Sequence, residues 1–246
     1  MLFLMISVFL SSCFLQGDGN TRIIENGGAG SFKAVVISPE DCPGITLYVP
    51  QDPGGTSLPV VLFEGPQDAK YEKYLNEMAS FGYVVADIGA SEPDAALEAL
   101  GASEALRDAS IDTSYMAVVS AAGPGTALPS GGLRTLVFLH SFGPAPDLPV
   151  LYIAGGLDEA VYAGIQRDFE SSDGHFAAVA TYPSGEEGTF AEAFGGSYSM
   201  LTLQWLEWLL KDRSWNRTIF TGEECICVYT GWGIQYKNEE KVMEQF

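Results

Sequence analysis

Residues 120–125 are the part of the chain whose types and spacing bear most directly on chemistry. They read Ser-Ala-Ala-Gly-Pro-Gly and come after an apolar stretch at 115–119 that predicts a buried strand. A strand that runs into a sharp turn of small residues is the plan of a nucleophile elbow, in which a serine at the tip of the turn attacks an acyl carbonyl. Ala122 occupies the tip here, and its methyl group cannot act as a nucleophile.

Ser120 is the alternative nucleophile if the tip of the turn is read two residues earlier. That reading places Val118 where a small residue is needed, and it breaks the spacing between Asp112 and the tip. We therefore interpret Ser120 as a small residue that replaces glycine beside the tip. Pro124, Pro129, Gly131 and Gly132 should shorten the helix expected after the turn to about two turns.

Two histidines, His140 and His175, are the only imidazoles in the chain. His140 closes a predicted central strand at 133–139, where a core or loop histidine is the expected role. His175 begins a predicted strand at 175–182, at the end opposite to the loop that would carry a base. Neither position predicts a catalytic base for the turn.

Length and composition indicate one large domain with a well-buried core, since the chain has 246 residues of which 47% are apolar. The formal net charge of -20 excludes phosphate-backbone partners, so we expect no binding to nucleic acid.

The first 14 residues form an apolar run that is too short to span a bilayer and is typical of a secretion signal. We predict a signal peptide over residues 1–19, a secreted protein and no transmembrane span. The segment Leu-Ser-Ser-Cys that ends at Cys13 also matches a bacterial lipobox, which would leave a lipid anchor on Cys13.

An exported chain with thiols is expected to form a disulfide, and Cys42 with one of the C-terminal pair Cys225 and Cys227 is the natural candidate. A bond between Cys225 and Cys227 is the alternative. Asn216 heads an Asn-Arg-Thr sequon and is a candidate glycosylation site.

Periodicity predicts that short apolar strands alternate with amphipathic helices, which indicates an α/β fold with a mostly parallel central sheet and helices on both faces. The domain should span residues 31–213, with a C-terminal extension at 214–246 packed on it and a frayed polar end at 238–246. The expected strands are 31–38, 44–50, 58–63, 83–88, 115–119, 133–139, 149–154 and 175–182, and the expected helices are 68–81, 93–108, 159–169 and 198–212.

Three phrases carry a family resemblance: Leu-Pro-Val-Val-Leu-Phe-Glu-Gly at 58–65, Phe-Gly-Tyr-Val-Val-Ala-Asp at 81–87, and Leu-Pro-Val-Leu-Tyr-Ile-Ala-Gly-Gly-Leu-Asp at 148–158. With the turn after 115–119, they resemble the α/β-hydrolase superfamily in order and spacing. The likeness is strongest to lidless cutinase-like, dienelactone hydrolase-like and chlorophyllase-like esterases.

The resemblance implies where the remaining catalytic groups would stand. Asp158 matches the acid of the triad, whereas the loop expected to carry the histidine contains none and offers Glu187 at that position. Gly123 and either Pro66 or Gln67 match the oxyanion donors, and a proline has no N–H to donate. The resemblance therefore implies a hydrolase whose triad has lost both its serine and its histidine.

Four carboxylates, those of Glu64, Asp158, Glu186 and Glu187, would converge on the rim of such a pocket. They are either a solvated acidic rim or a site for a hard cation. We expect no cofactor and no resident metal.

Three classes of function are implied by the resemblance. The first, which we favour, is a non-catalytic pseudo-hydrolase that binds an apolar or acyl small molecule or a protein partner. The second is an active carboxylic-ester hydrolase, cutinase-like or lipase-like, that uses a non-standard site. The third is a structural domain whose cleft has collapsed.

Overall fold

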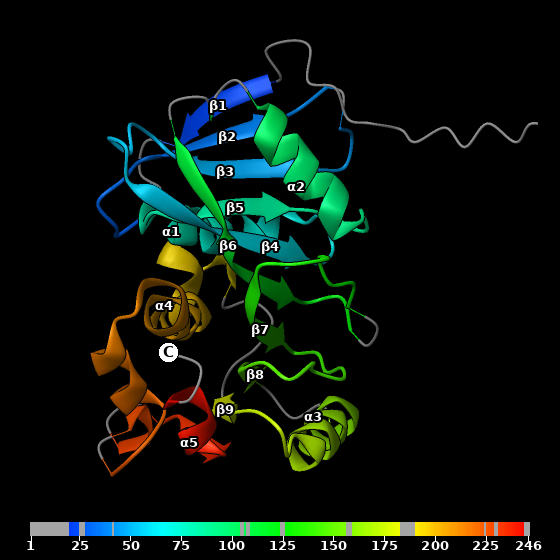
Figure 1. The fold of residues 1–246 in the computed structure, drawn as a ribbon, viewed down its shortest axis with the longest axis vertical. Coiled ribbons are helices and arrows are strands. Elements are labelled where there is room, and N and C mark those ends of the chain that lie inside the picture. The colour runs from blue at the N-terminus through cyan, green and yellow to red at the C-terminus, as the bar shows by residue number, and fades with distance from the viewer. Residues whose placement is uncertain are drawn as a thin grey trace, which may run out of the picture.

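The computed structural model describes residues 20–24, 28–40, 42–103, 106, 109–123, 126–155, 159–182, 190–223, 225–228 and 231–243. It contains a ten-stranded sheet (Figure 1), whose strands are β1 (Asn20–Ile24), β2 (Ala34–Ser38), β3 (Thr46–Pro50), β4 (Ser57–Glu64), β5 (Val84–Asp87), β6 (Ser110–Ser120), β7 (Leu133–Leu139), β8 (Val150–Gly155), β9 (Ala177–Tyr182) and β10 (Gly233–Lys237). The helices are α1 (Glu72–Ser80), α2 (Pro93–Ala102), α3 (Glu159–Ser171), α4 (Gly196–Lys211) and α5 (Glu239–Met243), with 3-10 turns η1 (Ala69–Tyr71), η4 (Ala193–Gly195), η5 (Ser214–Ile219) and η6 (Ile226–Val228).

The strand order across the sheet is β1-β2-β3-β5-β4-β6-β7-β8-β9-β10. The central strands β5, β4, β6, β7, β8 and β9 are all parallel, whereas β1 to β3 and β10 pair antiparallel at the two sides. The predicted α/β class and the mostly parallel sheet are therefore confirmed. The predicted antiparallel pair at 31–38 and 44–50 is the β2–β3 pair.

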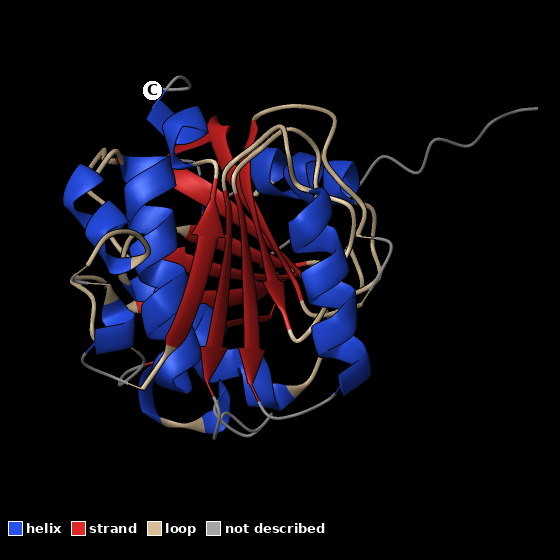
Figure 2. Cartoon of the chain, turned by 90° about the horizontal axis from the view of Figure 1, so that it is seen from below, coloured by secondary structure: helices blue, strands red, loops and turns tan. Residues whose placement is uncertain are grey.

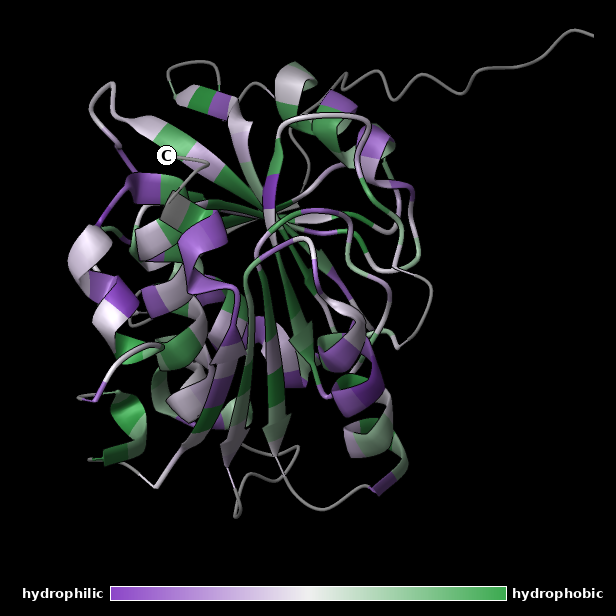
Figure 3. Ribbon diagram, turned by 60° about the horizontal axis from the view of Figure 1, so that its bottom comes forward, coloured by the Kyte–Doolittle hydropathy of each residue, from purple (hydrophilic) through white to green (hydrophobic). Residues whose placement is uncertain are grey.

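Helices cover both faces of the sheet (Figure 2), and each face has its own apolar core. The core under α1 and α4 is built around large rings such as Tyr74 and Trp205, which are fully buried. The core under α2 and α3 is mainly aliphatic, with Leu62 and Val118 among its members, and contains the stacked rings of Phe138 and Tyr152. The central strands are apolar over most of their length (Figure 3), as expected for a parallel sheet buried on both sides.

The connection from β6 to β7 differs from the expectation. A shortened helix is predicted after the turn, but residues 126–132 contain no helix. Gly132 explains part of this path, because its φ is +73° and a Cβ there would lie 1.9 Å from the Thr113 carbonyl oxygen. The two parallel strands are thus joined by an irregular segment in the part of it that the structure describes.

The C-terminal extension adds β10 to the outer edge of β9. The frayed end expected at 238–246 is wrong for its first part, because residues 239–243 form α5 and Val242 is only 2% exposed. Asn238 fixes this segment, since its amide donates to the carbonyl oxygens of Ser172 at 2.7 Å and His175 at 2.8 Å.

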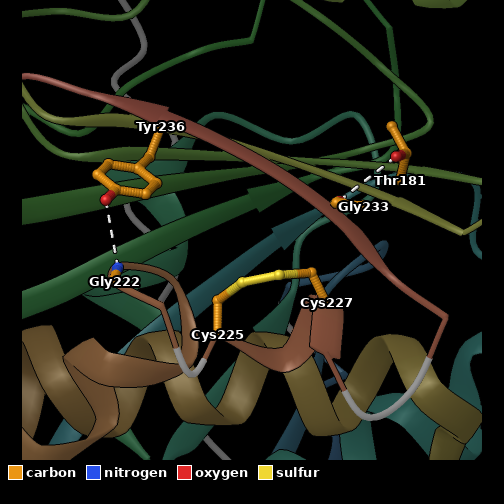
Figure 4. Close-up of a disulfide and its surroundings, with 6 residues drawn as sticks. All are labelled: Thr181, Gly222, Cys225, Cys227, Gly233 and Tyr236. Carbon is orange, nitrogen blue, oxygen red and sulfur yellow. Dashed lines mark hydrogen bonds between the residues drawn. A yellow bond between two sulfur atoms is a disulfide. The ribbon is translucent and has the colours of Figure 1, made fainter.

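The disulfide in the C-terminal extension joins Cys225 to Cys227 (Figure 4), so the expected bond from Cys42 to this pair is wrong. Cys42 is disulfide-bonded as well and is itself buried. Close to the Cys225–Cys227 bond, the amide of Gly222 donates to the Tyr236 hydroxyl at 3.2 Å, which ties the loop to β10. Sequence spacing alone does not determine which cysteines pair.

Asn216 is 1% exposed, and its side-chain amide donates to the Gln204 carbonyl oxygen at 3.1 Å. A glycan on this nitrogen would need the space and the hydrogen bond that α4 occupies in this conformation. Glycosylation at the 216–218 sequon stays a prediction from the sequence. In the described part of the chain, no helix is both long and apolar enough to cross a bilayer.

Candidate functional site at the carboxyl edge of the sheet

The carboxyl ends of the parallel strands meet at one edge of the sheet, which is where ligands bind in open α/β folds. Glu64 ends β4, Asp87 ends β5, Ser120 ends β6 and His140 comes directly after β7. We call these four residues the carboxyl-edge cluster. Each polar side chain comes after a buried apolar run, so the strands themselves place the cluster at this edge.

Ser120 is held in a buried hydrogen-bond network and is only 1% exposed. Its Oγ donates to Glu64 Oε2 at 3.0 Å and accepts from Thr126 Oγ1 at 2.9 Å. The other Glu64 oxygen, Oε1, accepts from the backbone N–H of Ala127 at 3.3 Å. The hydroxyl proton of Ser120 is thus directed at a carboxylate, and the network fixes the segment after β6 against the end of β4.

The His140 side chain lies on the face of the sheet that α1 and α4 cover. Its backbone has φ of 48°, an uncommon conformation for a residue with a side chain. Its Nε2 is 2.9 Å from the Tyr198 hydroxyl, and its ring packs edge-on against Tyr198 and Phe190 with centroid distances of 5.2 Å and 6.3 Å. Both aromatic residues belong to the core under α1 and α4.

The face of Ser120 is given by strand alternation, because side chains two residues apart share a face. Val118 belongs to the core under α2 and α3, so Ser120 points to that side. Ser120 and His140 therefore present their side chains on opposite faces of adjacent strands. The hydroxyl and the imidazole do not form a nucleophile and base pair.

Ala122 is exposed, in a bend after β6. The strained tip of a nucleophile elbow has a non-glycine residue with positive φ. Ala122 does not have a positive φ; the φ of +92° belongs to the next residue, Gly123. The sharp strand-to-helix turn predicted around Ala122 is thus not formed in the part of it that the structure describes.

The expected oxyanion positions lie at the end of β4. Pro66 and Gln67 are exposed, and the Gln67 side-chain amide donates to the Gly44 carbonyl oxygen at 2.6 Å. Gly65 packs between the ends of β4 and β6, because a Cβ there would lie 2.9 Å from the Phe63 ring and 3.3 Å from Ala121. The predicted site residues Asp158, Glu186 and Glu187 lie outside the described residues.

Comparison with protein-family models and with curated proteins finds no match. The geometry of the site is therefore the basis for its interpretation. In the described residues, no group of three or more histidines, cysteines and carboxylates is placed to hold a metal ion.

Asp87 was missed by the sequence reasoning and is the most perturbed carboxyl group of the cluster. It is 7% exposed and lies opposite Phe63 of β4, one residue before Glu64. Burial raises its pKa to about 6, and a hydrogen bond from the Gly89 amide at 3.3 Å partly offsets that rise. The signal in the sequence was an acidic residue directly after the buried run Val-Val-Ala, at the edge where ligands bind.

Proposed function

We propose that the chain is an exported protein of α/β-hydrolase type that binds an apolar or acyl small molecule at the carboxyl edge without hydrolysing it. The parallel sheet with helices on both faces is compatible with this fold family. The observation that carries the proposal is the separation of Ser120 from His140, whose side chains lie on opposite faces of the sheet.

Chemistry supports binding over turnover at this edge. A serine needs a base that takes its proton as it attacks, and an imidazole serves because its pKa lies near neutrality. The Ser120 hydroxyl instead donates to a carboxylate and is almost completely buried, so an ester carbonyl has no path to it in this conformation. Phe190 and Tyr198 pack against His140 and are 1% and 0% exposed, so an acyl chain reaches these rings only where this packing opens.

The test is hydrolysis of p-nitrophenyl butyrate by the full chain, compared with Ser120→Ala and with Ser130→Ala as the control at an exposed serine. We expect no turnover above background in any of the three. Hydrolysis that is lost in Ser120→Ala and kept in Ser130→Ala would overturn the proposal, as would a fluorophosphonate adduct on Ser120.

Binding is tested separately by thermal unfolding with octanoate as the acyl probe. A ligand at about ten times its Kd stabilises the folded state by about 1.4 kcal/mol, which raises the melting temperature by a few degrees. The shift should be lost in Tyr198→Ala, which removes the buried ring that packs against His140. An unchanged melting temperature of the unmodified chain would leave only a structural role for this edge.

A further inference from the structure

A cavity formed by described residues lies at the opposite, amino edge of the parallel sheet. Its volume is about 530 Å³, within the range of small-molecule sites. It is bounded by the segment before β2, by the starts of β4 and β6, and by the ends of α1 and α4. Segments far apart in sequence therefore meet around one space, and none of them belongs to the carboxyl-edge cluster.

The lining of this cavity contains an ion-pair network centred on Glu207, which is 5% exposed. Glu207 Oε1 accepts from the Tyr83 hydroxyl and from Lys211 Nζ, both at 2.9 Å, and Oε2 accepts from Arg213 Nη1 at 2.8 Å. Lys211 Nζ also donates to the Phe81 carbonyl oxygen at 2.6 Å. Burying the Glu207 carboxylate costs desolvation free energy, and this carboxylate holds the cationic groups of two residues that line the cavity.

Arg213 is the donor that this network leaves available. Its side chain is 56% exposed and lines the cavity, and one of its nitrogens is held by Glu207. A guanidinium has five N–H groups, so the group is anchored and can still donate to a ligand. The lining also includes three exposed polar residues, Thr56, Ser57 and Asp212.

Apolar surface completes the lining. Phe32, Phe81 and Tyr115 are half-buried and border the cavity. The Arg134 guanidinium lies 4.7 Å from the centroid of the Tyr115 ring, which fixes that ring at the wall. The site thus combines ring surfaces with hydrogen-bond donors and acceptors.

Charge selects the class of ligand. An anion is disfavoured by the net charge of -20 and by the carboxylates of Asp112 and Asp212 at the rim. A cation is disfavoured close to Lys211 and Arg213, which are also part of the lining. We infer that this cavity binds a neutral, hydroxyl-rich small molecule, a sugar or polyol, whose hydroxyls bond to Arg213 and the rim and whose apolar face packs on the rings.

The experiment is saturation-transfer NMR on the full chain with neutral D-glucose, D-galactose and D-mannose, and with glucosamine and glucuronate as the cationic and anionic forms of the same ring. We expect at least one neutral sugar to bind with a Kd of about 1 mM, and both charged sugars to bind more weakly. If no neutral sugar gives a signal at about 10 mM, or if only a charged sugar binds, the inference is wrong.

Two variants locate the binding. Arg213→Gln should weaken it about tenfold, since a hydrogen bond to a charged group is lost. Ser57→Tyr changes an exposed lining residue outside the Glu207 network and should abolish binding, because the larger side chain takes up space in the cavity. Arg217→Gln is the control, because its partner Glu239, at 2.8 Å, is not part of the cavity lining. Binding that survives Ser57→Tyr, in a variant with an unchanged melting temperature, would overturn the assignment. Neither result bears on ester turnover at the carboxyl edge.

Discussion

Replacing Asp87 with asparagine should stabilise the protein at neutral pH. Burial raises the pKa of Asp87 from 3.8 to about 6, so the folded chain holds a proton there at pH values where the unfolded chain has released it. Stability from this group is therefore complete below pH 3.8 and is lost as the pH rises through about 6. Asparagine does not titrate, and its carbonyl oxygen can still accept the Gly89 amide.

The size of the effect is set by the pKa difference. One pKa unit corresponds to 1.36 kcal/mol, so a rise from 3.8 to about 6 corresponds to an upper limit of about 3 kcal/mol at neutral pH. With 7% of the residue exposed, solvent reduces this energy only in part. We expect the advantage of Asp87→Asn over the unchanged chain to be small near pH 4, to grow up to about pH 7, and then to level off.

Urea unfolding of both chains over that pH range measures the difference directly. Asp173→Asn is the matched control, since the Asp173 side chain is 91% exposed and a surface pair with Lys237 contributes little. The difference in unfolding free energy between the two chains is the quantity to compare, because a chain with a net charge of -20 has other groups whose titration changes its stability with pH. If the gain from Asp87→Asn does not change with pH, or matches the control, burial does not perturb this carboxyl group as described.

Three further changes test other parts of the fold. Glu207→Ala removes a carboxylate that binds two cations and a tyrosine hydroxyl, and should lower the free energy of unfolding in urea by about 3–5 kcal/mol, against no change for the exposed Glu98→Ala. Gly132→Ala should destabilise by more than about 2 kcal/mol, or prevent folding, because the Cβ would clash with the Thr113 carbonyl at positive φ; soluble yield and urea unfolding measure this. Burial lowers the pKa of His175 below its usual 6.5, so the stability that its neutral form contributes is lost as the pH falls below 6.5. His175→Gln should therefore make the free energy of unfolding in urea less dependent on pH below 6.5. An unchanged pH dependence in this variant would contradict the assignment.

Much of the fold could be predicted from the sequence because its strands are continuous apolar runs. The strand expected at 133–139 is β7 with the same bounds, and the helix expected at 198–212 is α4 with small differences at its ends. Periodicity reports burial on a sheet or helix face, and burial dominates in this chain. It does not report the conformation of the segment after a strand, so the irregular path at 126–132 could not be foreseen from Pro and Gly content alone.

Contacts and backbone conformations that the sequence pattern does not report account for what sequence reasoning got wrong. Residues 239–243 look polar, yet they form α5 next to Asn238, which bonds to the turn before β9. Cys225 pairs with its near neighbour Cys227, a choice that spacing leaves open. In the candidate site, sequence reasoning weighed Ser120 and His140 as separate residues, whereas their relation depends on the backbone conformation at His140.

The backbone at His140 explains why the carboxyl edge differs from a working site by more than the hydroxyl missing at Ala122. Ser120 lies opposite Phe138, which belongs to the core under α2 and α3, so regular strand alternation would bring His140 to the side that Ser120 faces. The φ of 48° at His140 departs from strand geometry, and the ring packs against Tyr198 in the other core. The backbone carbonyl of Ser120 accepts a hydrogen bond at 2.8 Å from the hydroxyl of Ser141. Restoring a serine at the turn would therefore supply a nucleophile while the imidazole of His140 stays bound to Tyr198 on the opposite side.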